Sequence, residues 1–152
     1  MKTVMNAKIR NQLVKRIESI TGDEKPIWGK MSVYEMICHS SDQIKMSIGE
    51  IETKFVGNKM METLLKRLIL LGMPTPKGKV ETVKELKQGA GGTKPTSLDE
   101  DKKRFIKLVN EFDEKYPQGK NVRHPAFGMM NKKEWGRLVY IHADYHLKQF
   151  SR

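Results

Sequence analysis

Three helix start signals constrain the fold of this chain more than any other feature of its sequence. Segments 32–35 (SVYE) and 97–100 (SLDE) have the S-x-x-E form of a capping box, and segment 131–134 (NKKE) places Asn and Glu at the same spacing. Apolar residues spaced three or four positions apart follow each signal. The sequence therefore predicts helices over residues 33–52, 98–115 and 132–150.

A fourth helix is expected over residues 4–20. Its apolar residues recur at helical spacing and form one stripe: Ile9, Leu13, Ile17 and Ile20. A length of 152 residues suits one domain. We therefore expect an all-α single domain over residues 1–152, built as a four-helix bundle with a long crossover between its second and third helices.

The connection between those two helices, residues 53–96, is expected to be largely irregular. It contains one short helical patch at 60–71, a Gly- and Pro-containing run at 72–78 and a Gly-rich run at 89–95. Connections of this length in compact domains are usually lids, binding loops or disordered segments. No segment shows the alternation typical of a strand, so no sheet is predicted.

The net charge of +11 raises nucleic acid as a partner. The basic residues are dispersed, however, and the longest cluster, 102–104, directly follows three acidic residues at a predicted helix start. No RNA-binding or zinc-finger motif is present in the sequence. We therefore do not expect nucleic acid as a partner, and a basic surface that favours small anionic molecules is the better interpretation.

Neither a membrane span nor a secretory signal is expected. The first ten residues, MKTVMNAKIR, lack an apolar segment, and the most apolar stretch, 64–71, is far shorter than the ~20 residues that a span needs. The single cysteine, Cys38, excludes an internal disulfide framework and is expected to be an inert buried thiol. A cytoplasmic location is the resulting expectation.

Two histidines in the last predicted helix form a candidate metal site. His142 and His146 are four residues apart, so their Cβ atoms lie about 6 Å from each other on one face, shared with apolar residues such as Trp135. Such a pair can bind one divalent ion, and His39 on the second predicted helix could supply a third ligand. Three histidines would leave a coordination position open, as in catalytic sites. The alternative is a partly exposed pair without a metal.

Other residues are weaker candidates. Ala143 stands where a metalloprotease H-E-x-x-H motif requires Glu, so no general-base glutamate accompanies the pair. His124 could be an acid–base group near the metal, although a structural histidine that bonds the backbone is the favoured interpretation. Gln43 could line the pocket or be exposed, and Asp144 is expected to be a surface or interhelical partner.

The C-terminal segments resemble those of the DinB-like family. The resemblance rests on HPAFG at 124–128, EWGR at 134–137 and HADYHLKQF at 142–150, together with WGKMS at 28–32 and MICH at 36–39. These segments come from both ends of the predicted bundle. The match is closest to a branch of the family without an assigned activity.

The resemblance implies a four-helix bundle, often dimeric, that binds a divalent ion such as nickel or zinc through His39, His142 and His146. Members of the family include bacillithiol or mycothiol transferases, maleylpyruvate isomerases and hydrolases. We therefore expect a metal-dependent hydrolase or low-molecular-weight-thiol S-transferase. Its substrate is expected to be a small molecule, with a thiol as one candidate, and the protein is expected to be a homodimer. The alternative is a non-catalytic metal-binding or stress-response protein, so whether the chain is an enzyme stays open.

Overall fold

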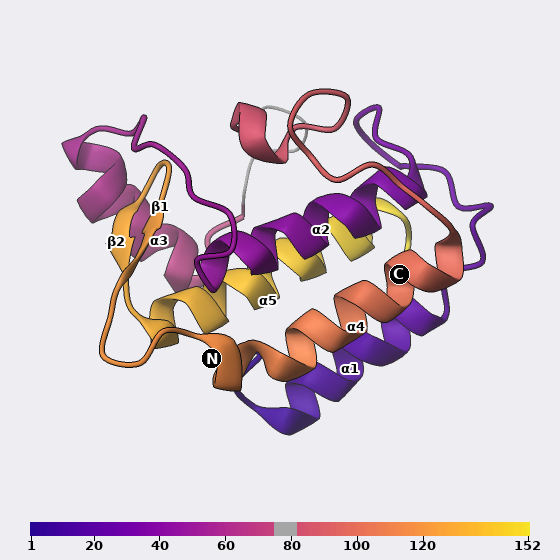
Figure 1. Ribbon diagram of the computed structural model, residues 1–152, viewed down its shortest axis with the longest axis horizontal. Coiled ribbons are helices and arrows are strands. Elements are labelled where there is room, and N and C mark those ends of the chain that lie inside the picture. Colours follow the sequence, from indigo (N-terminus) through magenta and orange to yellow (C-terminus); the bar gives the residue numbers. More distant parts are fainter. Residues whose placement is uncertain (75–81) are drawn as a thin grey trace.

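The computed structural model describes residues 1–74 and 82–152, and this part of the chain is predominantly helical (Figure 1). The α-helices are α1 (Ala7–Glu18), α2 (Val33–Ser47), α3 (Lys66–Leu71), α4 (Leu98–Lys115) and α5 (Lys132–Gln149). A π-helical turn, η1 (Met61–Leu65), precedes α3, and a 3-10 turn, η2 (Lys84–Leu86), precedes α4. Two short strands, β1 (Val122–His124) and β2 (Gly128–Met130), precede α5.

The three predicted helix start signals are confirmed by their hydrogen bonds. At α2, the Ser32 hydroxyl accepts from the Glu35 N–H at 3.2 Å, and the Glu35 carboxylate accepts from the Ser32 N–H at 2.8 Å. Asn131 forms the same reciprocal box at α5. The Ser97 hydroxyl caps α4 by accepting from the N–H of Glu100. These bonds satisfy backbone donors that the first helical turn leaves without partners.

Helix α2 ends five residues before the predicted boundary at residue 52. Gly49 has φ of +82°, and the N–H groups of Gly49 and Glu50 donate to the carbonyls of Met46 and Lys45. This is a Schellman motif, in which glycine adopts the left-handed conformation that closes a helix. Helix α1 likewise begins later than predicted, because Asn6 rather than a residue before Val4 caps its first turn.

The prediction that the chain contains no strand was wrong. Strands β1 and β2 form an antiparallel hairpin in which Val122 pairs with Met130 and His124 pairs with Gly128. Each strand has only three residues, too few for an alternating pattern to stand out in a sequence. The hairpin lies beside α3 at one end of the molecule (Figure 1), where the Lys66 ammonium donates to the Met129 carbonyl.

The core lies between the four longer helices. Helix α2 packs against α4 and α5, and α1 packs against the same two helices (Figure 1). The largest fully buried side chains come from these helices and their flanks: Leu13, Ile17, Ile20, Met36, Ile37, Ile44, Met46, Phe105, Phe112, Met130, Trp135 and Phe150. The predicted apolar stripes of α1 and α2 therefore face this core, which fixes the faces of α2 and α5 that meet.

The connection between α2 and α4 is anchored to α2 by a buried carboxylate. Asp42 is fully buried, and its two oxygens accept from the N–H of Thr93 at 2.7 Å and from the Thr93 hydroxyl at 2.6 Å. The predicted helical patch at 60–71 is present as η1 and α3. Of the predicted irregular run 72–78, residues 75–78 lie outside the described residues.

We expect Asp42→Ala to lower the free energy of unfolding by about 3 kcal/mol, because it removes the buried carboxylate that accepts from the N–H and the hydroxyl of Thr93. Urea denaturation followed by circular dichroism measures this change. Asp99→Ala is the matched control: Asp99 is exposed in the first turn of α4 and its loss should cost under about 1 kcal/mol. Equal destabilisation by the two variants would contradict the anchoring role of Asp42.

Candidate metal centre

Three of the four histidines meet between α2 and α5. His39 lies in the second turn of α2, and His142 and His146 lie one turn apart on the face of α5 that packs against α2. His39 and His146 are 4% and 9% exposed, and His142 is partly buried. The structure therefore brings together the three residues selected from the sequence, from two helices separated by about one hundred residues of chain.

The ring nitrogens of these histidines are close enough to share one ion. The Nε2 atoms of His39 and His142 are 3.1 Å apart, and one ligand nitrogen from each of the three residues lies within 4.8 Å of the others. Ligands at the usual zinc–nitrogen distance in a tetrahedral site are separated by about 3.3 Å. The pair formed by His39 and His142 is already near that separation. The cluster could therefore hold a metal ion.

Two hydrogen bonds fix which nitrogen faces the centre. His39 Nδ1 lies 3.1 Å from the Leu86 carbonyl oxygen in η2, and His146 Nδ1 lies 2.9 Å from Oε1 of Gln149. An oxygen of either kind can only accept, so both Nδ1 atoms carry the proton and both Nε2 atoms keep a lone pair. Gln149 is itself held by a bond from its Nε2 to the Trp28 carbonyl at 2.7 Å. Metal-binding histidines in proteins are commonly oriented in this way.

Burial keeps the three imidazoles neutral. Desolvation lowers the pKa of His39, and it lowers the pKa of His146 to about 4. The pKa of His142 falls well below its usual value because of burial first and then because of repulsion from the neighbouring histidines. Neutral imidazoles are the form that binds a metal, so this environment favours coordination near neutral pH.

The facing ring nitrogens of His39 and His142 also bear on whether the cluster suits a metal. The Nδ1 atom of His142 is buried and has no hydrogen-bond partner among the described residues. Without an ion, the facing Nε2 atoms of His39 and His142 need a proton between them, which then leaves the Nδ1 lone pair of His142 without a donor. An ion between the Nε2 atoms removes the need for that proton, because both lone pairs then point at the metal. His142 Nδ1 then carries a hydrogen and still has no acceptor among the described residues.

His124 lies in β1, and its contacts agree with the structural interpretation. Its Nδ1 accepts from the N–H groups of Ala126 and Phe127, each at 3.1 Å, and its ring stacks on Phe127 with 4.5 Å between centroids. Burial lowers its pKa to about 3. His124 is not part of the three-histidine cluster. An acid–base role for it stays a prediction.

Two further expectations can be compared with the structure. Asp144 pairs with Arg16 of α1 at 2.6 Å and with Lys148 at 2.7 Å, so it is an interhelical partner as expected. The Cys38 thiol is buried, and desolvation together with the nearby Asp101 raises its pKa to about 11. A thiol with that pKa is a poor nucleophile at neutral pH.

The sequence analysis missed the two residues that orient the imidazoles. Gln149 lies three residues after His146 in the same helix, so helical spacing alone could have identified it. Leu86 contributes a backbone carbonyl from the long connection, 47 residues after His39. No side-chain pattern marks such a contact in a sequence.

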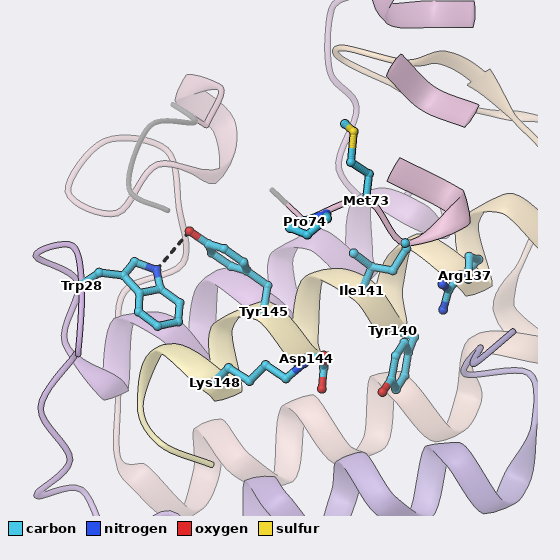
Figure 2. A pocket seen from close by; sticks show the side chains of 10 residues that line it. Trp28, Met73, Pro74, Arg137, Tyr140, Ile141, Asp144, Tyr145 and Lys148 are labelled. Atoms are coloured by element: carbon cyan, nitrogen blue, oxygen red, sulfur yellow. Dashed lines mark hydrogen bonds and ion pairs between the residues drawn. The ribbon is translucent and has the colours of Figure 1, made fainter. Parts of the chain in front are cut away.

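A cavity of about 320 Å³ lies along α5, on a face next to the one that carries His142 and His146 (Figure 2). Its wall combines aromatic and aliphatic side chains with charged ones: Trp28, Gly72, Met73, Pro74, Arg137, Tyr140, Ile141, Asp144, Tyr145 and Lys148. Trp28 Nε1 donates to the Tyr145 hydroxyl at 3.0 Å, and the Tyr145 ring lies 5.1 Å from the His146 ring. Tyr145 therefore stands between this cavity and the histidine cluster, although no histidine lines the cavity.

Comparison with known families gives one match. The model of the family described as "Protein of unknown function (DUF1569)" matches residues 10–152. The chain belongs to this family. The matched range includes His39, His142 and His146, and all of α2 and α5. No curated protein and no solved structure matches the chain.

Within residues 1–74 and 82–152, none of the helices combines the length and the apolar character that crossing a bilayer requires.

Proposed function

We propose that this protein is a divalent-metal-dependent enzyme whose ion is held by His39, His142 and His146. The observation that carries the proposal is the convergence of three neutral imidazoles, two of them with their Nδ1–H groups bound to fixed oxygens. Zinc and nickel are the proposed ions, since neutral imidazole suits both. Such an ion acts as a Lewis acid that lowers the pKa of a bound water or thiol.

The architecture supports the same proposal. We propose that α1, α2, α4 and α5 form a DinB-like four-helix bundle, in which the connection from 48 to 97 is the long crossover. Helix α2 packs against both α4 and α5, and facing helices of a bundle place ligands in its interior in this way. The reaction proposed is hydrolysis or transfer of a low-molecular-weight thiol, with a small molecule as substrate. A homodimer and a cytoplasmic location remain part of the same proposal.

The chain's own residues define what a substrate would meet. Gln149 and the Leu86 carbonyl hold His146 and His39 in one tautomer, so the ligand atoms need no reorganisation before they bind. The cavity beside Tyr145 offers aromatic walls from Trp28 and Tyr140 with Arg137 and Lys148 at its edges. This composition suits a small, partly apolar molecule that carries a negative charge.

A non-catalytic metal-binding role is the second candidate, and one observation favours it. None of the three histidines lines the cavity, and His39 and His146 are almost fully buried. A closed site of this kind would hold a structural ion with no position for a substrate.

Metal analysis of protein purified without a histidine tag tests the proposal. We expect one zinc or nickel ion per chain, and we expect the metal-free protein to gain about 5 to 10 °C in Tm when the ion is added at 100 times its Kd. Absence of both stoichiometric metal and a Tm shift on titration would reject the site.

A Co²⁺-loaded sample separates the two candidate functions. Free cysteine added to this sample should change its visible spectrum if a coordination position is open to a thiol. An unchanged spectrum at saturating cysteine would favour the structural role.

A further inference from the structure

Gln43 is a buried amide whose polar atoms have no hydrogen-bond partner within residues 1–74 and 82–152. Its side chain is 3% exposed, and neither Nε2 nor Oε1 has a partner among the described residues. Within that part of the chain it is the one amide side chain for which both polar atoms are buried in this way. Burying an amide without partners is costly, and such groups in proteins usually meet a water molecule or a ligand.

The other buried polar residues of α2 all have partners. Ser41 and Ser47 donate to carbonyls of their own helix, at 2.8 and 2.6 Å. Asp42 accepts from Thr93, and His39 donates to the Leu86 carbonyl. The lack of partners is therefore specific to Gln43 and does not reflect poor packing along the whole helix.

Helix geometry directs Gln43 toward the histidine cluster. It follows His39 by four residues, so the two side chains share one face of α2. Side chains on a helix lean toward its N-terminus, which for Gln43 is the direction of His39. Among the described residues, His142 Nδ1 is a further buried nitrogen without a partner, and it lies on the helix that packs against α2.

We infer that Gln43 is a positioning residue for the small ligand that occupies the coordination position left open by the three histidines. Its amide donates a hydrogen bond to that ligand and so satisfies a group that the described part of the chain leaves without a partner. The inference rests on the proposed three-histidine metal site. It adds a ligand-binding group that contacts the occupant of the site and does not bind the ion.

Azide binding to the Co²⁺-loaded protein tests this role. Azide fills an open coordination position and can accept a hydrogen bond, and its binding is followed in the visible spectrum. We expect Gln43→Leu to weaken azide binding about tenfold, the effect of losing one hydrogen bond to a charged ligand. The Kd for Co²⁺ should stay within about threefold of wild type, because all three histidines remain.

The stability of the metal-free variant gives a second readout. Removing a buried amide that has no partner should raise the Tm of Gln43→Leu by about 2 to 4 °C in EDTA. A residue kept for structural reasons would lower it. Gln43→Met provides a second, unbranched replacement of similar length if leucine disturbs the packing.

Gln149→Leu is the matched control, because it removes an amide that holds a histidine. We expect it to weaken Co²⁺ binding by 10- to 100-fold, the reverse of the pattern expected for Gln43→Leu. Unchanged azide affinity in both Gln43 variants would overturn the inference, as would a Co²⁺ affinity that falls as in Gln149→Leu. Failure of the wild-type protein to bind Co²⁺ would reject the metal site itself, and this role with it.

Discussion

His142→Ala will bind zinc or nickel at least about 100-fold more weakly than the wild-type protein. His142 faces His39 with 3.1 Å between their Nε2 atoms, so the substitution removes one of three ligands and leaves two on separate helices. Loss of a residue that merely orients a ligand reduces metal affinity 10- to 100-fold, and loss of a ligand should exceed that range. Isothermal titration calorimetry on protein stripped with EDTA measures the difference.

The fourth histidine supplies the control for this experiment. His124→Asn keeps a side-chain oxygen that can accept from the backbone N–H groups now bound to His124 Nδ1. It should retain the wild-type affinity for the ion, because His124 is outside the cluster. If His142→Ala keeps a full equivalent of metal, the ligand assignment is wrong.

The metal-free protein is expected to lose several kcal/mol of stability as the pH falls from about 6.5 to about 4. Burial lowers the pKa of His146 from 6.5 to about 4 and that of His124 to about 3 in the folded state. Unfolded chains therefore bind more protons than folded chains across this interval, and acidification favours unfolding. Above about pH 6.5 the histidines are neutral in both states, so the free energy of unfolding keeps its full value. At pH 4, His146 alone lowers that free energy by an amount on the order of 3 kcal/mol.

Urea denaturation in EDTA at several pH values between 7.5 and 4 measures this dependence. His124→Asn removes one of the buried histidines whose pKa is lowered, so its midpoint should fall less steeply with pH than that of wild type. A wild-type midpoint that stays constant from pH 7 to pH 4.5 would show that the buried histidines keep ordinary pKa values. Saturating zinc at neutral pH should raise the midpoint, because only the neutral imidazoles bind.

Most of the helical framework could be predicted from local sequence signals. The start of α2 at Val33 and both ends of α4 follow from capping residues and from the spacing of apolar residues. The errors lie at α1 and at the end of α2, where the ends of a helix depend on single caps such as Asn6 and Gly49. The hairpin of β1 and β2 was missed because its strands are too short for a period to be recognised.

The candidate site was predictable in part. His142 and His146 could be paired because helical spacing fixes the relation of residues four apart. The position of His39 beside them depends on how α2 packs against α5, and the tautomers depend on Leu86 and Gln149. The sequence analysis left Gln43 equally open as a pocket residue or an exposed one, and its 3% exposure excludes the second.

By itself the sequence determined where α2, α4 and α5 begin, which faces of the helices are apolar, and that two imidazoles share one face. These properties depend on residues within one or two turns of each other, so local hydrogen bonding and periodicity are sufficient to predict them. Only the tertiary structure decided that His39 meets that pair and that Gln43 finds no partner among the residues described. Both result from the packing of helices about one hundred residues apart, where the contacts depend on burial and on the fold as a whole.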